Sequence, residues 1–122
     1  MKFVKLWLPV IVWCYIIYFL SDIPGLSTGL GLYDLFLRKL AHIMEFFILT
    51  LLLYRAFRLS FRLQFTGLLS WSAGLSFLYA VSDEYHQTLV LNRCGNVGDL
   101  LIDSIGIAIA VYIFVKKSYV KN

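Results

Sequence analysis

Four long apolar stretches constrain this chain more than any other feature of its sequence. They cover approximately residues 3–20, 39–54, 65–81 and 97–115. A helix that crosses the hydrocarbon core of a bilayer needs about 20 mostly apolar residues, and each stretch approaches that length. Backbone groups in lipid must form their hydrogen bonds within their own segment, so we expect helices. The runs are continuous, whereas transmembrane strands alternate between apolar and polar residues.

The composition excludes an ordinary soluble domain. Hydrophobic residues make up 61% of the 122 residues, and the mean hydropathy is +0.81. Small domains bury only about 60–70% of their chain surface on folding, which is too little to hide this much apolar area. We therefore predict a single all-α domain over residues 1–122, an integral membrane four-helix bundle. The first stretch ends in "YFLSDIPG" and lacks a small-x-small cleavage site, so we expect an uncleaved anchor.

The distribution of basic residues predicts the orientation in the membrane. Lys and Arg in short loops favour the cytoplasm. Eight of the eleven Lys and Arg residues fall in the N-terminal end, the second loop and the C-terminal tail, which share one side of a four-span chain. The other side holds Arg38, Lys39 and Arg93. We therefore expect both termini in the cytoplasm, with residues 21–38 and 82–96 outside.

The acidic residues and histidines gather at the predicted outer end. All of them fall in outer loops or in the outer halves of the spans: Asp22, Asp34, Glu45, Asp83, Glu84, Asp99, Asp103, His42 and His86. Interfacial Lys and Arg anchors explain why the inner ends lack acids, but they do not explain acids placed inside spans. A charged group inside a span costs about 2–3 kcal/mol on insertion scales, so it normally faces the bundle interior and has a partner.

The second span begins with an ionisable helical face. Arg38, His42 and Glu45 are spaced i, i+4, i+7 and share that face. Asp34 precedes the segment by one turn, where it would cap the helix. Two interpretations stand side by side. Glu45 forms an internal ion pair with Arg38 or Arg93, or the group is functional, which is the default for ionisable residues inside a membrane.

The third span ends in "YAVSDEYHQ". If its helix continues one turn past Val81, then Ser82, Asp83, His86 and Gln87 project on one side. Short hairpin loops would bring these groups to the same depth as the polar face of the second span. The sequence thus predicts a polar pocket that opens outward.

The fourth span begins with two acids, Asp99 and Asp103, spaced i, i+4 at the positive end of the helix dipole. Two acids on one face repel each other unless a positive group lies between them. Arg93 would serve, and so would a divalent cation, for which Asp, Glu and His are suitable ligands. No cofactor follows with certainty from these residues, and a divalent metal is the one that they would suit.

These motifs together resemble the VanZ-like membrane proteins. "RKLAHIMEFFIL", "SDEYHQ" and "DLLIDSIG" follow one another between about Arg38 and Gly106. They match the family's Arg-Lys-x-x-His-x-x-Glu-Phe element, its Asp-Glu-x-His-Gln element and its downstream Arg with a pair of Asp. The chain departs from the family at "LVLNR", where Phe-x-Pro-Gly-Arg is frequent, so we expect that loop to differ in shape from the family's.

The resemblance implies a multi-pass protein of the bacterial cytoplasmic membrane that is connected to the cell envelope. The founding member is associated with low-level resistance to the glycopeptide teicoplanin. From the residues and the resemblance together, we expect two sets of site residues. The candidates for catalysis are His42, Glu45, Asp83, His86, Asp99 and Asp103. The candidates for substrate binding are Arg38, Lys39, Glu84, Gln87 and Arg93.

Three hypotheses about function remain open at this point. The site is an enzyme acting on envelope lipids or lipid-linked wall precursors, with a histidine as base or nucleophile and arginines that clamp phosphate. A metal-assisted phosphotransferase or hydrolase of lipid head groups is one version, weakly echoed by a GxxxDxxxD spacing from Gly95 to Asp103. Alternatively the site binds such a lipid without chemistry, or the network is purely architectural.

Two other classes fit the sequence poorly. A proton or ion channel needs a polar relay through the membrane, but the inner halves of the spans lack acids and histidines. Nucleic-acid binding is not expected, because the net charge of +4 is explained by the cations that set the topology. Cys14 lies mid-span and Cys94 in a loop, so free thiols are expected. The sequence leaves the oligomeric state open.

Overall fold

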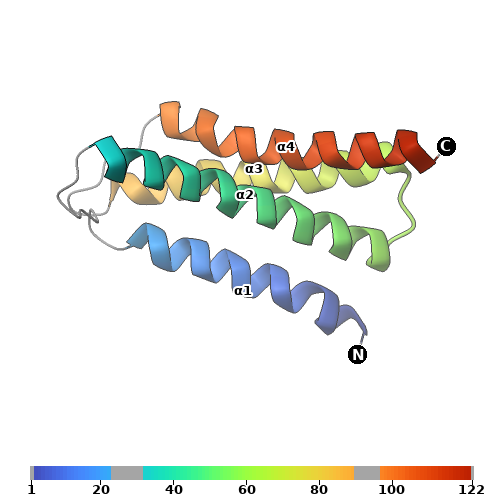
Figure 1. Ribbon diagram of the computed structural model, residues 1–122. Coiled ribbons are helices and arrows are strands. Elements are labelled where there is room, and N and C mark those ends of the chain that lie inside the picture. Colours follow the sequence, from blue (N-terminus) through green and yellow to red (C-terminus); the bar gives the residue numbers. More distant parts are fainter. Residues whose placement is uncertain (1, 23–31, 90–96, 122) are drawn as a thin grey trace.

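The protein is a bundle of long helices in a computed structural model that describes residues 2–22, 32–89 and 97–121. The helices are α1 (Lys2–Asp22), α2 (Leu32–Ser60), α3 (Phe65–Thr88) and α4 (Val97–Lys121), as Figure 1 shows. Each contains a segment that is long and apolar enough to cross a membrane. The predicted all-α architecture with four membrane-spanning helices is confirmed.

Three of the helices extend well beyond the apolar stretches that predicted them. α2 begins at Leu32 and α3 continues to Thr88, while α4 runs to Lys121. The backbone hydrogen-bond ladder continues into the polar flanks, because each further residue adds a bond to a helix already nucleated. Asp34 therefore lies inside the first turn of α2. Its predicted position as a cap one turn before the helix is wrong.

Among the described residues, the most extensive helix contact lies between α2 and α4. A methyl group placed on Gly106 of α4 would lie 2.2 Å from the backbone oxygen of Ile43 and 3.0 Å from the backbone nitrogen of Phe47, both in α2. Only a residue without a side chain permits this approach of two backbones. The contact fixes the depth at which the polar residues of α4 face those of α2.

Apolar side chains fill the interior and also cover the outside. Ile17, Phe46 and Leu49 are almost completely buried, whereas Ile11, Leu78 and Leu101 are exposed. An outer surface of large apolar residues suits contact with lipid tails. The buried core therefore depends on shape and close packing, because lipid tails are as apolar as the interior.

α1 lies against α2 and α3, and tryptophan and tyrosine side chains hold it there. Trp7 Nε1 donates to Ser60 Oγ at 2.9 Å, and Trp13 Nε1 donates to the backbone oxygen of Glu45 at 2.9 Å. The hydroxyl of Tyr79 donates to the backbone oxygen of Cys14. Cys14 is a free thiol, while Cys94 lies outside the described residues.

The first turn of α1 and the last turn of α4 lie at the same end of the bundle (Figure 1). An even number of antiparallel spans requires this arrangement. The end with the termini also holds the basic end of α2, whereas the histidine and acids of the spans lie toward the other end. Which end faces the cytoplasm stays a prediction from the basic residues.

Candidate functional site

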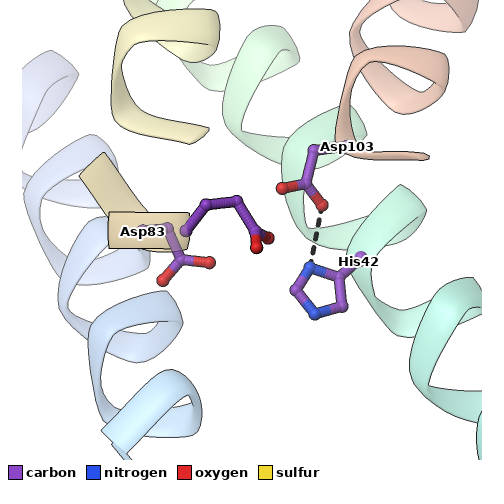
Figure 2. Close-up of side chains that lie close together, drawn as sticks. His42, Asp83 and Asp103 are labelled. Carbon is purple, nitrogen blue, oxygen red and sulfur yellow. Dashed lines mark hydrogen bonds and ion pairs between the residues drawn. The ribbon is translucent and has the colours of Figure 1, made fainter. Parts of the chain in front are cut away.

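Four side chains from three helices converge near the end of the bundle away from the termini. His42 comes from α2, Asp83 and Glu84 from α3, and Asp103 from α4. Each contributes a nitrogen or oxygen atom such that these atoms all lie within 4.8 Å of one another. Figure 2 shows His42, Asp83 and Asp103 directed toward a common space from three different helices. We call these four residues the polar cluster.

Helix periodicity explains why α3 contributes two members. Its buried face includes Ser76, Ala80, Asp83, Glu84 and Gln87, which recur at helical spacing. The helix continues past Val81 as the prediction required, but its inward face differs from the one predicted. Ser82 is exposed and His86 is half-buried, so Ser82 does not project with the others. Glu84 is buried instead and takes a place in the cluster.

A hydrogen bond between side chains links α2 and α4 inside the polar cluster. His42 Nδ1 lies 2.8 Å from Asp103 Oδ1 (Figure 2). Asp103 is fully buried, while the side chain of His42 remains 13% exposed. A carboxylate accepts, so the imidazole N–H donates in this contact. The pair holds the imidazole plane in one orientation.

The second oxygen of Asp103 has no hydrogen-bond partner among the residues that the structure describes. It is buried, and a buried carboxylate oxygen without a donor is costly. A cation, or a donor supplied by a ligand, would satisfy this oxygen. It is the observation that distinguishes the polar cluster from a closed network of ion pairs.

A divalent ion fits the donor set and its spacing. Donor atoms on opposite sides of a calcium ion are separated by about 4.6–5.2 Å, twice the usual ligand distance. The four donor atoms lie within 4.8 Å of one another, which suits an ion with such distances, whereas the shorter bonds of tetrahedral zinc would require the donors to move closer together. One imidazole with three carboxylates is a ligand set that zinc, manganese and related divalent ions accept.

A supporting amide holds one of the carboxylates in place. Gln87 Nε2 donates to Asp83 Oδ2 at 3.2 Å, one turn along α3, and both side chains are buried. Groups behind a metal ligand orient it and tune its basicity. Gln87 was predicted to bind substrate, and this contact places it behind Asp83.

Polar contacts continue below the cluster toward the middle of the bundle. Thr50 Oγ1 lies 2.8 Å from Ser76 Oγ and 2.8 Å from the backbone oxygen of Phe46, and both hydroxyl residues are fully buried. Ser72 is buried one turn further along α3. The sequence analysis missed this second polar layer, because single hydroxyls in an apolar run carry no motif. The i, i+4 spacing of Ser72 and Ser76 places both on one helical face, and this spacing could have indicated a buried polar layer.

The remaining predicted site residues lie outside the four-residue cluster. Glu45 is half-buried on α2, one turn beyond His42, and Asp99 is half-buried in the first turn of α4. The ring of His86 packs on the ring of Tyr18 with centroids 4.6 Å apart. Arg38 is exposed and Lys39 is half-buried near the start of α2. Arg93 lies outside the described residues, as does the rest of the segment that departs from the family pattern after Leu89.

Comparison with known proteins shows the family to which the chain is similar. A family model described as VanZ/LLP1 matches residues 6–118. No curated protein matches, and no solved structure does. The family match includes all four residues of the polar cluster and extends over α1, which the motifs themselves did not reach.

Proposed function

The chain belongs to the VanZ/LLP1 family, and we propose that its polar cluster holds a divalent cation through which it binds the phosphate of an envelope-lipid head group. A lipid-linked wall precursor carries the same chemistry. The observation that carries this proposal is the convergence of His42, Asp83, Glu84 and Asp103 within 4.8 Å, with one buried oxygen of Asp103 lacking a partner among the described residues.

Charge supports a bridging cation. Three carboxylates face one imidazole in the polar cluster, and carboxylates alone repel a phosphate. A divalent ion bound by carboxylates keeps coordination positions for phosphate oxygens, as Mg²⁺ and Zn²⁺ sites in phosphate-handling proteins do. Arg38 and Lys39 lie on the same helix as His42, about one turn before it. They would pair with the remaining phosphate charge.

The location supports a lipid as the source of the phosphate. His42 lies about 15 Å along α2 from Leu32, at 1.5 Å per residue. The candidate span of α2 begins at Phe36, so His42 lies about 9 Å inside it, in the half of the span nearer the head groups at that end. By the positive-inside rule this end is the extracytoplasmic one. The protein would therefore act in the outer leaflet of the bacterial cytoplasmic membrane, where wall precursors are used.

The His42–Asp103 pair favours one second candidate, hydrolysis or transfer at the bound phosphate. An imidazole oriented by a buried carboxylate is a common general base. In this version the three carboxylates would hold the ion, and Asp103 Oδ1 would keep the His42 ring in place. Nε2 of His42 would take the proton of a water or alcohol as its oxygen bonds to phosphorus, the P–O bond to the leaving group would break, and the protonated ring would return the proton to the leaving oxygen. The bound ion would supply the charge stabilisation that phosphoryl chemistry requires.

Metal binding by the purified full chain tests the proposal. After chelator treatment, Mn²⁺ titration followed by electron paramagnetic resonance should give one tight site per chain. Loss of groups behind a ligand alone costs about 10–100-fold in metal affinity, so Asp103→Asn and Asp83→Asn should each weaken Mn²⁺ by at least about tenfold. Asp99→Asn changes an acid of α4 outside the cluster and should bind like the parent. Equal Mn²⁺ affinity in all four proteins would refute the proposal.

A cell assay tests the connection to the envelope that the family resemblance implies. His42→Ala at normal abundance should lower tolerance to teicoplanin and change the pool of lipid-linked wall precursors in lipid extracts. The same variant with normal tolerance and an unchanged precursor pool would leave the cluster with an architectural role. A drop in abundance alone would point to that role as well.

A further inference from the structure

The end of the bundle opposite the polar cluster contains a groove of about 480 Å³ between α2, α4 and the start of α3. Cationic side chains line it, two from α2 and one from α4: Arg55, Arg58 and Lys117. Its apolar wall includes Tyr54 and Phe114, whose rings stack with centroids 3.9 Å apart. We call this feature the basic groove. Its volume lies within the range of small-molecule sites, about 300–1,000 Å³.

The charge of the basic groove is not balanced by acids. None of its lining residues is acidic, and within residues 2–22, 32–89 and 97–121 no ion pair joins its cations to a carboxylate. The first turn of α3, which begins at Phe65 on the groove wall, also lacks acids. The N-terminus of a helix carries a partial positive charge. Cations and helix dipole therefore act in the same direction.

The side chains are arranged for a ligand that is charged at one end and apolar at the other. Arg55, Arg58 and Lys117 are exposed, whereas Tyr54 and Phe114 are half-buried. Arg55, Arg58 and Lys117 all fall within the membrane-spanning segments of α2 and α4, close to their ends. A soluble anion would use the cations alone, but a lipid would use the cations and the aromatic wall together.

We propose that the basic groove is a binding site for an anionic phospholipid, with the phosphodiester on Arg55, Arg58 and Lys117. The glycerol and the first carbons of an acyl chain then lie along the wall formed by Tyr54 and Phe114. This site is distinct from the polar cluster and does not depend on the function proposed for it. The two sites lie toward opposite ends of the bundle and so serve opposite leaflets.

Lipid titration of the purified full chain tests this assignment by native mass spectrometry. The parent should bind phosphatidylglycerol in preference to zwitterionic phosphatidylcholine. Each Lys or Arg near an anionic lipid contributes about fivefold in affinity, so Arg58→Gln/Lys117→Gln should bind phosphatidylglycerol about 30-fold more weakly. The control is Arg62→Gln/Lys116→Gln, which removes two exposed cations from the same end but none from the groove. Each double variant removes two cations from that end, so any effect of charge on membrane orientation should be the same in both.

A second variant and a competitor complete the design. Ser118→Trp fills the groove and leaves every cation in place, so it should also lose phosphatidylglycerol. Inorganic phosphate at millimolar concentration should not displace the lipid. Equal losses in the groove and control variants would overturn the assignment. Displacement by inorganic phosphate would overturn it too, because the groove would then recognise a free anion.

Discussion

Burial of the carboxylates in the polar cluster costs this protein folding free energy. Asp103 is fully buried, and Asp83 and Glu84 retain only 4% and 7% exposure. Buried charges stabilise a fold only when geometry and partners are nearly complete, and apolar replacements of similar size are often as stable or more so. A cluster with three such groups is therefore better explained by ligand binding than by stability.

Replacing Gly106 gives a prediction about stability that can be compared with the same replacement at a second glycine. Gly106→Ala should lower the free energy of unfolding by about 1–3 kcal/mol, because the new methyl group would meet the backbone of Ile43 at 2.2 Å. Gly74→Ala is the control, since an added Cβ there has nothing within 4 Å. It should be neutral or stabilising by up to about 1 kcal/mol, as alanine favours helix. Reversible unfolding in detergent measures both, and a stable Gly106→Ala would contradict the close approach of α2 and α4.

The buried hydroxyl pair gives a second prediction at this scale. Thr50→Val and Ser76→Ala each remove one side of the contact at 2.8 Å. Hydrogen bonds between membrane helices average about 0.6 kcal/mol in double-mutant cycles, with a maximum near 1.7. The coupling energy of these two substitutions should fall in that range, measured by unfolding the single and double variants. Strict additivity would mean that the contact contributes nothing to helix association.

The helices themselves show which parts of a membrane protein a sequence predicts well. Apolar runs identified four spans, and the face containing His42 was recognised on α2. Their ends were less well predicted, because α2 and α3 continue through polar residues to Ser60 and Thr88. Hydropathy marks where lipid begins and ends, but the backbone ladder continues for as long as neighbouring helices support it.

The attachment of α1 gives a prediction at the scale of elements. Trp13→Phe should destabilise the bundle by about 0.5–1.5 kcal/mol, because the indole bond to the backbone of Glu45 is lost in the part-buried interior. Trp71→Phe is the matched change at a side chain that is 56% exposed, and it should have little effect. Thermal unfolding of both variants in one detergent tests this. Equal shifts would show that α1 is held by packing alone.

The sequence predicted where the site lies, but it did not predict every residue that takes part in it. Sequence spacing placed ionisable groups of three spans at one end, and His42, Asp83 and Asp103 do meet. It did not reveal that Glu84 would point inward while Ser82 faces outward, because either rotation of α3 satisfies the motif. It also gave no hint of the basic groove, which depends on how the ends of α2 and α4 lie beside α3. Contacts between spans depend on how the helices pack, as Gly106 shows for α2 and α4. The sequence of one span alone does not reveal this packing.

Orientation in the membrane is the prediction for the whole molecule. In a Cys14→Ala background, an impermeant maleimide applied to intact cells should label Cys94, which belongs to the predicted outer loop. The control replaces both cysteines and introduces Tyr119→Cys at a position 79% exposed near the C-terminus. That variant should be labelled only after the cells are permeabilised. The reverse pattern would invert the protein and place the polar cluster in the inner leaflet.

The length of α2 has a consequence for how the protein meets membranes of different thickness. Its 29 residues extend about 44 Å, whereas the hydrocarbon core is about 30 Å thick. The excess must be absorbed by tilt or by protrusion into the head-group zones. Thicker bilayers would place His42 deeper below the phosphates, and thinner ones would bring it closer to them. Lipid composition could thereby regulate how readily a head group reaches the cluster, with no change in any of its four residues.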